Sequence, residues 1–132
     1  MDTYGPDRVK RHGDHAVVLG ASIAGLLAAR VLADAFERVT IVERDPLPAD
    51  ADPRRGVPQG RHIHVLLVAG QTIMETLVPG FTDELAGSGA LTVDYSSEFH
   101  VHTAGGFLAR AADNDMLLYY ASRPLIERTL RS

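Results

Sequence analysis

Residues 15–45 carry the pattern that most restricts how this chain can fold. An apolar run over residues 16–19 is followed by six residues that are nearly all small: Gly20, Ala21, Ser22, Ile23, Ala24 and Gly25. Helical spacing then extends to about Phe36, and a second apolar run over residues 39–42 ends at Glu43. This order predicts a strand, a tight turn, a helix and a second strand that ends on an acid.

The residues of the turn permit close approaches that larger residues would prevent. Gly20 allows the chain to turn sharply out of the strand, and Gly25 allows the helix to lie close to it. Ser22 replaces the second glycine of the usual G-x-G-x-x-G pattern, and its hydroxyl can cap the helix or donate to a phosphate. The free N–H groups and the dipole of the first helical turn attract an anion. The turn is therefore a candidate pyrophosphate site.

Glu43 complements the turn, because it follows the second strand directly. Its carboxylate can accept hydrogen bonds from both hydroxyls of a ribose, and it would repel a 2′-phosphate. Turn and acid together predict a dinucleotide site, and an ordinary strand–helix corner with small packing residues is the alternative. The helix between them is expected to bury one stripe of side chains: Ala24, Leu27, Ala28, Val31 and Ala35.

Composition limits the class of protein. A chain of 132 residues is long enough for one domain with a core. The net charge of −4 argues against nucleic acid as a partner, and the absence of cysteine excludes disulfides and thiolate chemistry. No apolar run approaches the roughly 18 residues of a membrane span, so we expect a cytoplasmic protein. Residues 1–14 are polar, which predicts a flexible lead-in.

The elements after Glu43 are less sharply marked. The prolines of residues 44–61 predict a long loop, and residues 64–78 predict a helix with a stripe of Leu66, Gly70, Ile73 and Leu77. We expect a short helix over residues 82–86, capped by Thr82, and a helix from 123 onward with Pro124 in its first turn. Strands are expected at residues 91–95, 98–103 and 107–109, with a turn at 105–106. A loop at 111–114 and an apolar run at 116–120 complete the chain before the last helix.

Five stretches of the chain carry a family resemblance: residues 17–25 (VVLGASIAG), 40–45 (TIVERD), 56–67 (GVPQGRHIHVLL), 77–80 (LVPG) and 121–127 (ASRPLIE). They resemble the N-terminal part of FAD-dependent monooxygenases of the para-hydroxybenzoate hydroxylase type. Within that family they look closest to bacterial flavin epoxidases and hydroxylases of secondary metabolism, which are similar to squalene epoxidases. The first two stretches are shared by many flavoproteins, and the third and fourth are more particular to this subgroup.

The resemblance implies an α/β fold, with a Rossmann-like FAD-binding βαβ unit, additional helices and a small β-meander. It implies that Gly20, Ser22 and Gly25 hold the FAD pyrophosphate, with Ala21, Ile23 and Ala24 between them. It further implies that Glu43 binds the adenosine ribose and that Arg44 lies beside the adenine.

The same resemblance assigns two further arginines to the candidate site. Arg61 and Arg123 match family arginines that approach the cofactor, where a guanidinium can engage phosphate or ribose oxygens. For Arg61, a solvated loop charge is an equally good interpretation. Arg123 stands at a strand-to-helix corner, as Ser22 does.

By the resemblance, the whole enzyme uses NAD(P)H to reduce FAD and O2 to hydroxylate or epoxidise an organic substrate. Family members are much longer, and their later flavin-contacting motifs are missing from this sequence. We therefore expect an incomplete domain, in which residues 15–132 are the N-terminal part of an FAD/NAD(P)-binding domain without catalytic residues. We expect an incomplete sheet to expose an edge through which the chain self-associates.

Other chemistries fit less well. The pairs His62/His64 and His100/His102 resemble metal ligands, but no carboxylate with diagnostic spacing accompanies them, so we expect no metal site. Ala24 stands where a Gly-x-Ser-x-Gly nucleophile elbow requires glycine. Two functions stay open beside the monooxygenase: an NAD-binding dehydrogenase or reductase unit, and a catalytically inactive nucleotide-binding module.

Overall fold

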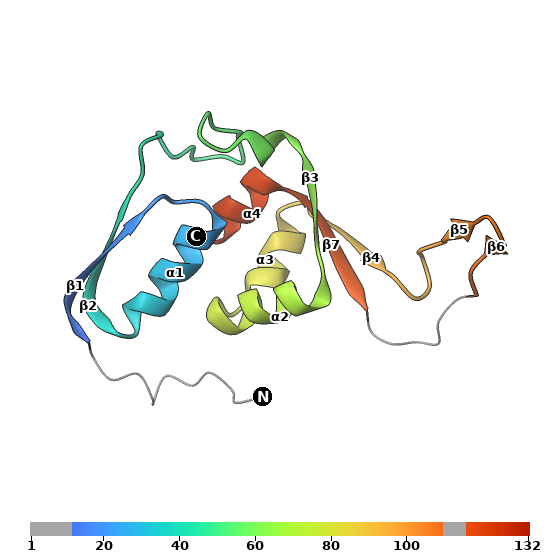
Figure 1. Cartoon of the computed structure of the whole chain (residues 1–132), viewed down its shortest axis with the longest axis horizontal. Helices are drawn as coiled ribbons and strands as arrows, with labels where there is room; N and C mark the ends of the chain where they lie inside the picture. Colours follow the sequence, from blue (N-terminus) through green and yellow to red (C-terminus); the bar gives the residue numbers. More distant parts are fainter. Residues whose placement is uncertain (1–11, 110–115) are drawn as a thin grey trace.

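The computed structural model describes residues 12–109 and 116–132 (Figure 1). Over these residues the chain is a mixed α/β protein with four α-helices and three small sheets. Two regions carry most of the structure: a βαβ unit near the N-terminus, and a three-stranded sheet with three helices. None of the helices in the described ranges is long and apolar enough to cross a membrane.

The βαβ unit consists of β1 (Gly13–Leu19), α1 (Ile23–Ala33) and β2 (Phe36–Val42). β1 and β2 pair in parallel, with Leu19 opposite Val42, so both strands end at the same edge. The predicted strand–helix–strand order is confirmed, with different bounds. β1 starts at Gly13, inside the predicted lead-in, and residues 1–11 lie outside the described residues. The helix ends at Ala33 rather than near Phe36, which opens β2.

The predicted buried stripe of α1 is confirmed only in part: Ala35, just after the helix, is buried, and Leu27 packs against the core. Ala24, Ala28 and Val31 are exposed, whereas Ala29 is the buried residue of the helix. α1 is apolar over most of its circumference, so its sequence does not define which face packs inward. On the side of the sheet that α1 does not cover, Leu19 remains 80% exposed. Self-association of this region stays a prediction.

The second region is an antiparallel sheet with the order β3-β7-β4, formed by β3 (Ile63–Leu66), β7 (Leu117–Ser122) and β4 (Leu91–Asp94). The last strand therefore lies in the centre, and the predicted sequential meander is wrong. The helix predicted over residues 64–78 is also wrong at its start: its first residues belong to β3, which pairs with β7, and α2 (Val68–Leu77) begins after an extended Leu67.

α3 (Phe81–Gly87) and α4 (Arg123–Thr129) complete the helices of this region. Thr82 does not cap α3, because left-handed Gly80 precedes the helix and Thr82 is held by Glu75. The predicted helix after Arg123 is confirmed, with Pro124 in its first turn. In α2 the predicted stripe is wrong, since the buried residues are Gln71 and Met74 and Ile73 is exposed.

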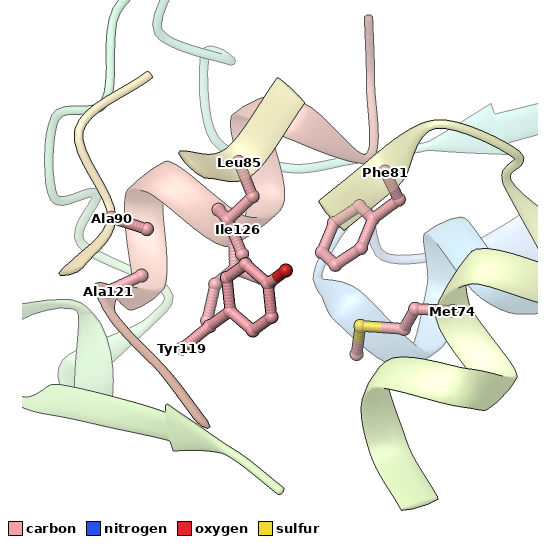
Figure 2. Packing of buried hydrophobic residues seen from close by; sticks show 7 residues of the cluster. All are labelled: Met74, Phe81, Leu85, Ala90, Tyr119, Ala121 and Ile126. Atoms are coloured by element: carbon pink, nitrogen blue, oxygen red, sulfur yellow. The ribbon is translucent and has the colours of Figure 1, made fainter. Parts of the chain in front are cut away.

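The hydrophobic core lies between the second sheet and its helices. Figure 2 shows side chains from α2, α3, β7 and α4 converging on one another. The buried cluster comprises Met74, Phe81, Leu85, Ala90, Tyr119, Ala121 and Ile126. Ile23 and Leu27 of α1 pack against this cluster, and the Arg30 side chain donates to the Leu77 carbonyl at 2.8 Å. These contacts attach the βαβ unit to the core.

A short hairpin, β5 (His102–Thr103) with β6 (Gly106–Phe107), projects from the body of the molecule (Figure 1). It replaces the longer strands predicted at residues 98–103 and 107–109, and its turn lies at residues 104–105. β4 and β7 confirm the strand predicted at 91–95 and the apolar run at 116–120. The loop predicted at 111–114 lies outside the described residues.

Candidate nucleotide-binding site

The turn between β1 and α1 depends on its two glycines. Gly20 has a φ of 97°, a left-handed conformation that residues with a side chain rarely adopt. A Cβ atom on Gly25 would collide with the carbonyl oxygen of Gly20. α1 therefore starts in close contact with the end of β1. The Leu26 N–H donates the first helical bond to the Ser22 carbonyl, so the preceding amides of the first turn have no partner within the helix.

The Glu43 carboxylate lies beside this turn. Its Oε2 accepts from the Ala21 N–H at 2.7 Å and from the Arg54 side chain at 2.8 Å. Its Oε1 accepts from the backbone N–H groups of Arg44 and Asp45 at 2.8 and 3.1 Å. The Ala21 amide is the largest cause, followed by Arg54 and Asp45, of a Glu43 pKa lowered from 4.5 to about 2. Glu43 is thus an anion with two donors at each oxygen.

Arg54 connects Glu43 to a second acid, Glu127. The Arg54 side chain is only 6% exposed, and its Nη2 donates to Glu127 Oε2 at 3.0 Å and to the Ala21 carbonyl at 2.9 Å. Burial alone would lower the pKa of Arg54, but its bonds to Glu43 and Glu127 outweigh burial and raise that pKa. Arg54 is therefore a fixed positive charge between two carboxylates.

Glu127 also accepts hydrogen bonds from Ser22 and Arg123. Its Oε1 accepts from the Ser22 hydroxyl at 2.7 Å and from Arg123 Nε at 3.0 Å, while Arg123 Nη2 donates to the Ser22 hydroxyl oxygen at 2.6 Å. Burial on its own would raise the pKa of Glu127, but hydrogen bonds from Ser22, Arg54 and Arg123 outweigh it and hold the pKa below its usual value. The Ser22 side chain does not cap α1.

A hollow of about 400 Å³ opens at the edge where β1 and β2 end. Glu43, Arg54, Glu127 and Arg123 form a charged cluster joined by ion pairs. The lining of the hollow combines apolar side chains, the turn and part of this cluster: Leu19, Gly20, Ser22, Val42, Glu43, Arg44, Arg54, Gly56 and Val57. This volume lies within the range of small-molecule sites, which are mostly apolar with a few fixed polar groups. The arrangement can hold an anion at the helix start and a hydroxyl-bearing group at Glu43.

The structure brings most of the predicted site residues together. Gly20, Ala21 and Ser22 form the turn beside Glu43, and Ile23, Ala24 and Gly25 open α1. Arg123 reaches Ser22 from the other region. Arg44 lines the hollow, although its side chain is 78% exposed.

Arg61 is not brought to the carboxylates. It ends a 3₁₀ helix (Pro58–Arg61), is exposed, and lines a separate hollow with Arg54, Arg55 and neighbouring prolines.

Sequence reasoning missed Arg54 and Glu127, the two residues that tie the site together. Glu127 stands four residues after Arg123 on one helix, a spacing that indicates an ion pair and could have drawn attention to it. Arg54 had no such signal, because it lies in a proline-rich loop beside Arg55.

The histidine pairs do not form a metal centre within the described ranges, where no group of three or more histidines or acids could hold an ion. His64 Nδ1 lies 3.0 Å from the His62 carbonyl oxygen, and His102 packs edge-on against Phe107.

The chain is 39% identical over 127 residues to "Protein Rv3254" of Mycobacterium tuberculosis (strain ATCC 25618 / H37Rv). The match covers 94% of this chain and 27% of the relative, so the chain spans about a quarter of that protein's length. No protein-family model matches the chain.

Proposed function

We propose that the chain is the FAD-binding portion of an FAD-dependent monooxygenase. In the whole enzyme, NAD(P)H and O2 would serve to hydroxylate or epoxidise an organic substrate. The observation that carries the proposal is the meeting of Glu43 with the start of α1, where the Ala21 N–H donates to the Glu43 carboxylate at 2.7 Å. A ribose site and a phosphate site then border the same hollow. We further propose that residues 13–43 form a Rossmann-like unit, which the parallel pairing of β1 and β2 around α1 supports.

Each part of the hollow suits one part of the cofactor. The first-turn amides of α1 and the turn around Ser22 would receive the pyrophosphate, because partnerless N–H groups and the helix dipole favour an anion. Glu43 would accept from the ribose hydroxyls. The exposed side chains of Leu19 and Val42 offer an apolar wall for the adenine, with Arg44 beside it.

Binding must rearrange one contact. Each oxygen of Glu43 already accepts two hydrogen bonds from the protein, so a ribose hydroxyl has to replace a donor. Three of those donors are backbone amides fixed by the turn and the end of β2. We therefore infer that the ribose replaces the Arg54 side chain at Glu43, while Glu127 retains Arg54.

The bound FAD would supply the redox chemistry, and the residues described here would bind and orient it. We expect no acid–base or nucleophilic role for them. The substrate and the choice between hydroxylation and epoxidation depend on residues outside the hollow.

Titration of the 132-residue chain with FAD, followed by quenching of flavin fluorescence, tests the proposal. We expect saturable binding that Glu43→Gln weakens about tenfold, since a charge-assisted hydrogen bond becomes a neutral one. Glu75→Gln is the matched control, because Glu75 also accepts hydrogen bonds from backbone amides, those of Gly80 and Thr82, but lies at the α2–α3 corner.

The remaining outcomes contradict the proposal in different ways. Binding of NAD without FAD would favour a dehydrogenase or reductase unit. Binding of FAD that Glu43→Gln leaves unchanged would place the cofactor elsewhere. Binding of neither cofactor would favour an inactive module.

A further inference from the structure

Glu127 is a buried acid whose hydrogen bonds all go to the candidate site. Its side chain is 4% exposed, and it lies on α4 between Ile126 and Arg128, on the side that faces the βαβ unit. One oxygen accepts from Ser22 and Arg123, and the other accepts from Arg54. Buried charges are costly unless they are paired, so an acid in this place needs these partners.

Ser22 has no hydroxyl proton left for a ligand. A serine hydroxyl donates one hydrogen bond, and here Glu127 receives it, while Arg123 donates to the hydroxyl oxygen. The serine that replaces a glycine in the turn therefore links the turn to α4. It neither caps α1 nor offers its proton to a phosphate in this arrangement.

The same bonds fix two guanidinium groups beside the turn. Arg123 donates through Nε and Nη2, whereas its Nη1 donates to no acceptor among the described residues. Arg54 donates to Glu127 through Nε and Nη2 and to the Ala21 carbonyl through Nη2. These bonds keep Arg54 in place even if a ribose hydroxyl replaces it at Glu43.

We propose that Glu127 is a positioning residue that holds Arg54 and Arg123 beside the Ser22 turn to receive the diphosphate of an adenine dinucleotide. This inference rests on the proposed function. A carboxylate suits the task because both its oxygens accept, one toward each arginine. Glutamine offers one accepting oxygen, and its NH2 group would face the donors of Arg54 or those of Ser22 and Arg123.

Two small ligands test the proposal by calorimetry on the full chain: ADP, which carries the diphosphate, and adenosine, which lacks it. We expect Glu127→Gln to weaken ADP binding about tenfold, as for one lost charge-assisted contact, and to change adenosine binding less than about twofold. Glu75→Gln is the control and should change neither. A purely structural loss would weaken both ligands alike, so the difference between them identifies positioning.

Ser22→Gly provides a second variant that keeps the usual glycine pattern and should fold even if Glu127→Gln does not. It removes the link between the turn and Glu127, and we expect a loss of ADP affinity of about threefold that does not add to the loss in Glu127→Gln. The loss in Glu127→Gln should also be smaller at high salt, because it concerns a charged ligand.

Failure of this inference is distinct from failure of the proposed function. Wild-type chain that binds neither ADP nor FAD overturns the function and the inference with it. Wild-type chain that binds ADP, with Glu127→Gln and Ser22→Gly binding it equally well or more tightly, overturns only the role of Glu127. Equal losses for ADP and adenosine overturn that role as well.

Discussion

The two regions of the molecule differ in what they contribute: one carries the hydrophobic core, and the other carries the turn and the acid of the candidate site. The β3-β7-β4 sheet and its helices supply the whole buried hydrophobic cluster, including Phe81 and Ile126. The βαβ unit buries mainly small residues and leaves Leu19 largely exposed, yet it carries the turn and Glu43. The charged cluster joins them, because Glu127 from the packed region holds Ser22 and Arg54.

This difference indicates that the candidate site depends on a region outside the turn and the acid that first predicted it. A βαβ unit of two strands has little core of its own, and two-stranded sheets are marginal without further packing. Ile23, Leu27 and the bond from Arg30 to Leu77 attach it to the larger region. Disrupting the core should therefore abolish the site, whereas changes on the open face of β1 should spare the fold.

Phe81→Ala should give the largest effect. Phe81 is 1% exposed in the centre of the core, and loss of its ring should lower the free energy of unfolding by about 3–5 kcal/mol. Leu19→Ala is the contrast, because replacing an exposed leucine should change the free energy of unfolding by less than about 0.5 kcal/mol. Urea unfolding followed by circular dichroism measures both. Equal losses for the two variants would contradict the division of packing between the regions.

Gly25→Ala should give an intermediate effect. A Cβ there meets the Gly20 carbonyl, so α1 must shift away from β1 at a cost of about 1–3 kcal/mol. Gly70→Ala is the matched control in α2, where a Cβ meets no atom, and it should stabilise the chain by about 0.5–1 kcal/mol. Thermal unfolding distinguishes them. A neutral Gly25→Ala would show that the turn does not need this close contact.

Acid should give an effect that appears only at low pH, through Glu43. Its pKa is lowered from 4.5 to about 2, so the folded chain binds fewer protons there than the unfolded chain. The resulting stability is fully present above pH 4.5 and is lost as the pH falls toward about 2. The melting temperature of Glu43→Gln should therefore fall less over this window than that of the wild type. Parallel curves for the two proteins would exclude a contribution from Glu43.

Local patterns predicted the βαβ unit well and the other sheet poorly. Residues 16–19 and 39–42 are apolar runs bounded by turn residues, and the helix between them is long enough to be recognised. The local pattern assigns residues 64–66 of β3 to a helix, because the partner strand β7 lies more than fifty residues later, with Ser122 opposite Ile63. Such pairing leaves no periodic signal in a four-residue strand. The face of α1 was misjudged because alanine and leucine surround that helix.

Apart from Arg123, which the family resemblance implied, the site could be predicted only where its residues lie close in sequence. Gly20, Ser22 and Glu43 belong to one short unit, and the structure places the Glu43 carboxylate against the turn. The hydrogen bond between Ser22 and Glu127 joins residues 105 positions apart, and no spacing rule connects them. Arg54 becomes recognisable only when the loop is seen to fold back between the two acids.

The most direct test of a cofactor site at the junction of the two regions is a titration of the ¹⁵N-labelled 132-residue chain with FAD, followed by amide NMR shifts. The account predicts saturable shifts centred on residues 20–25, 43–45 and 54–57, with weaker shifts at the start of α4. Shifts confined to the β5–β6 hairpin, or no shifts at saturating FAD, would contradict it.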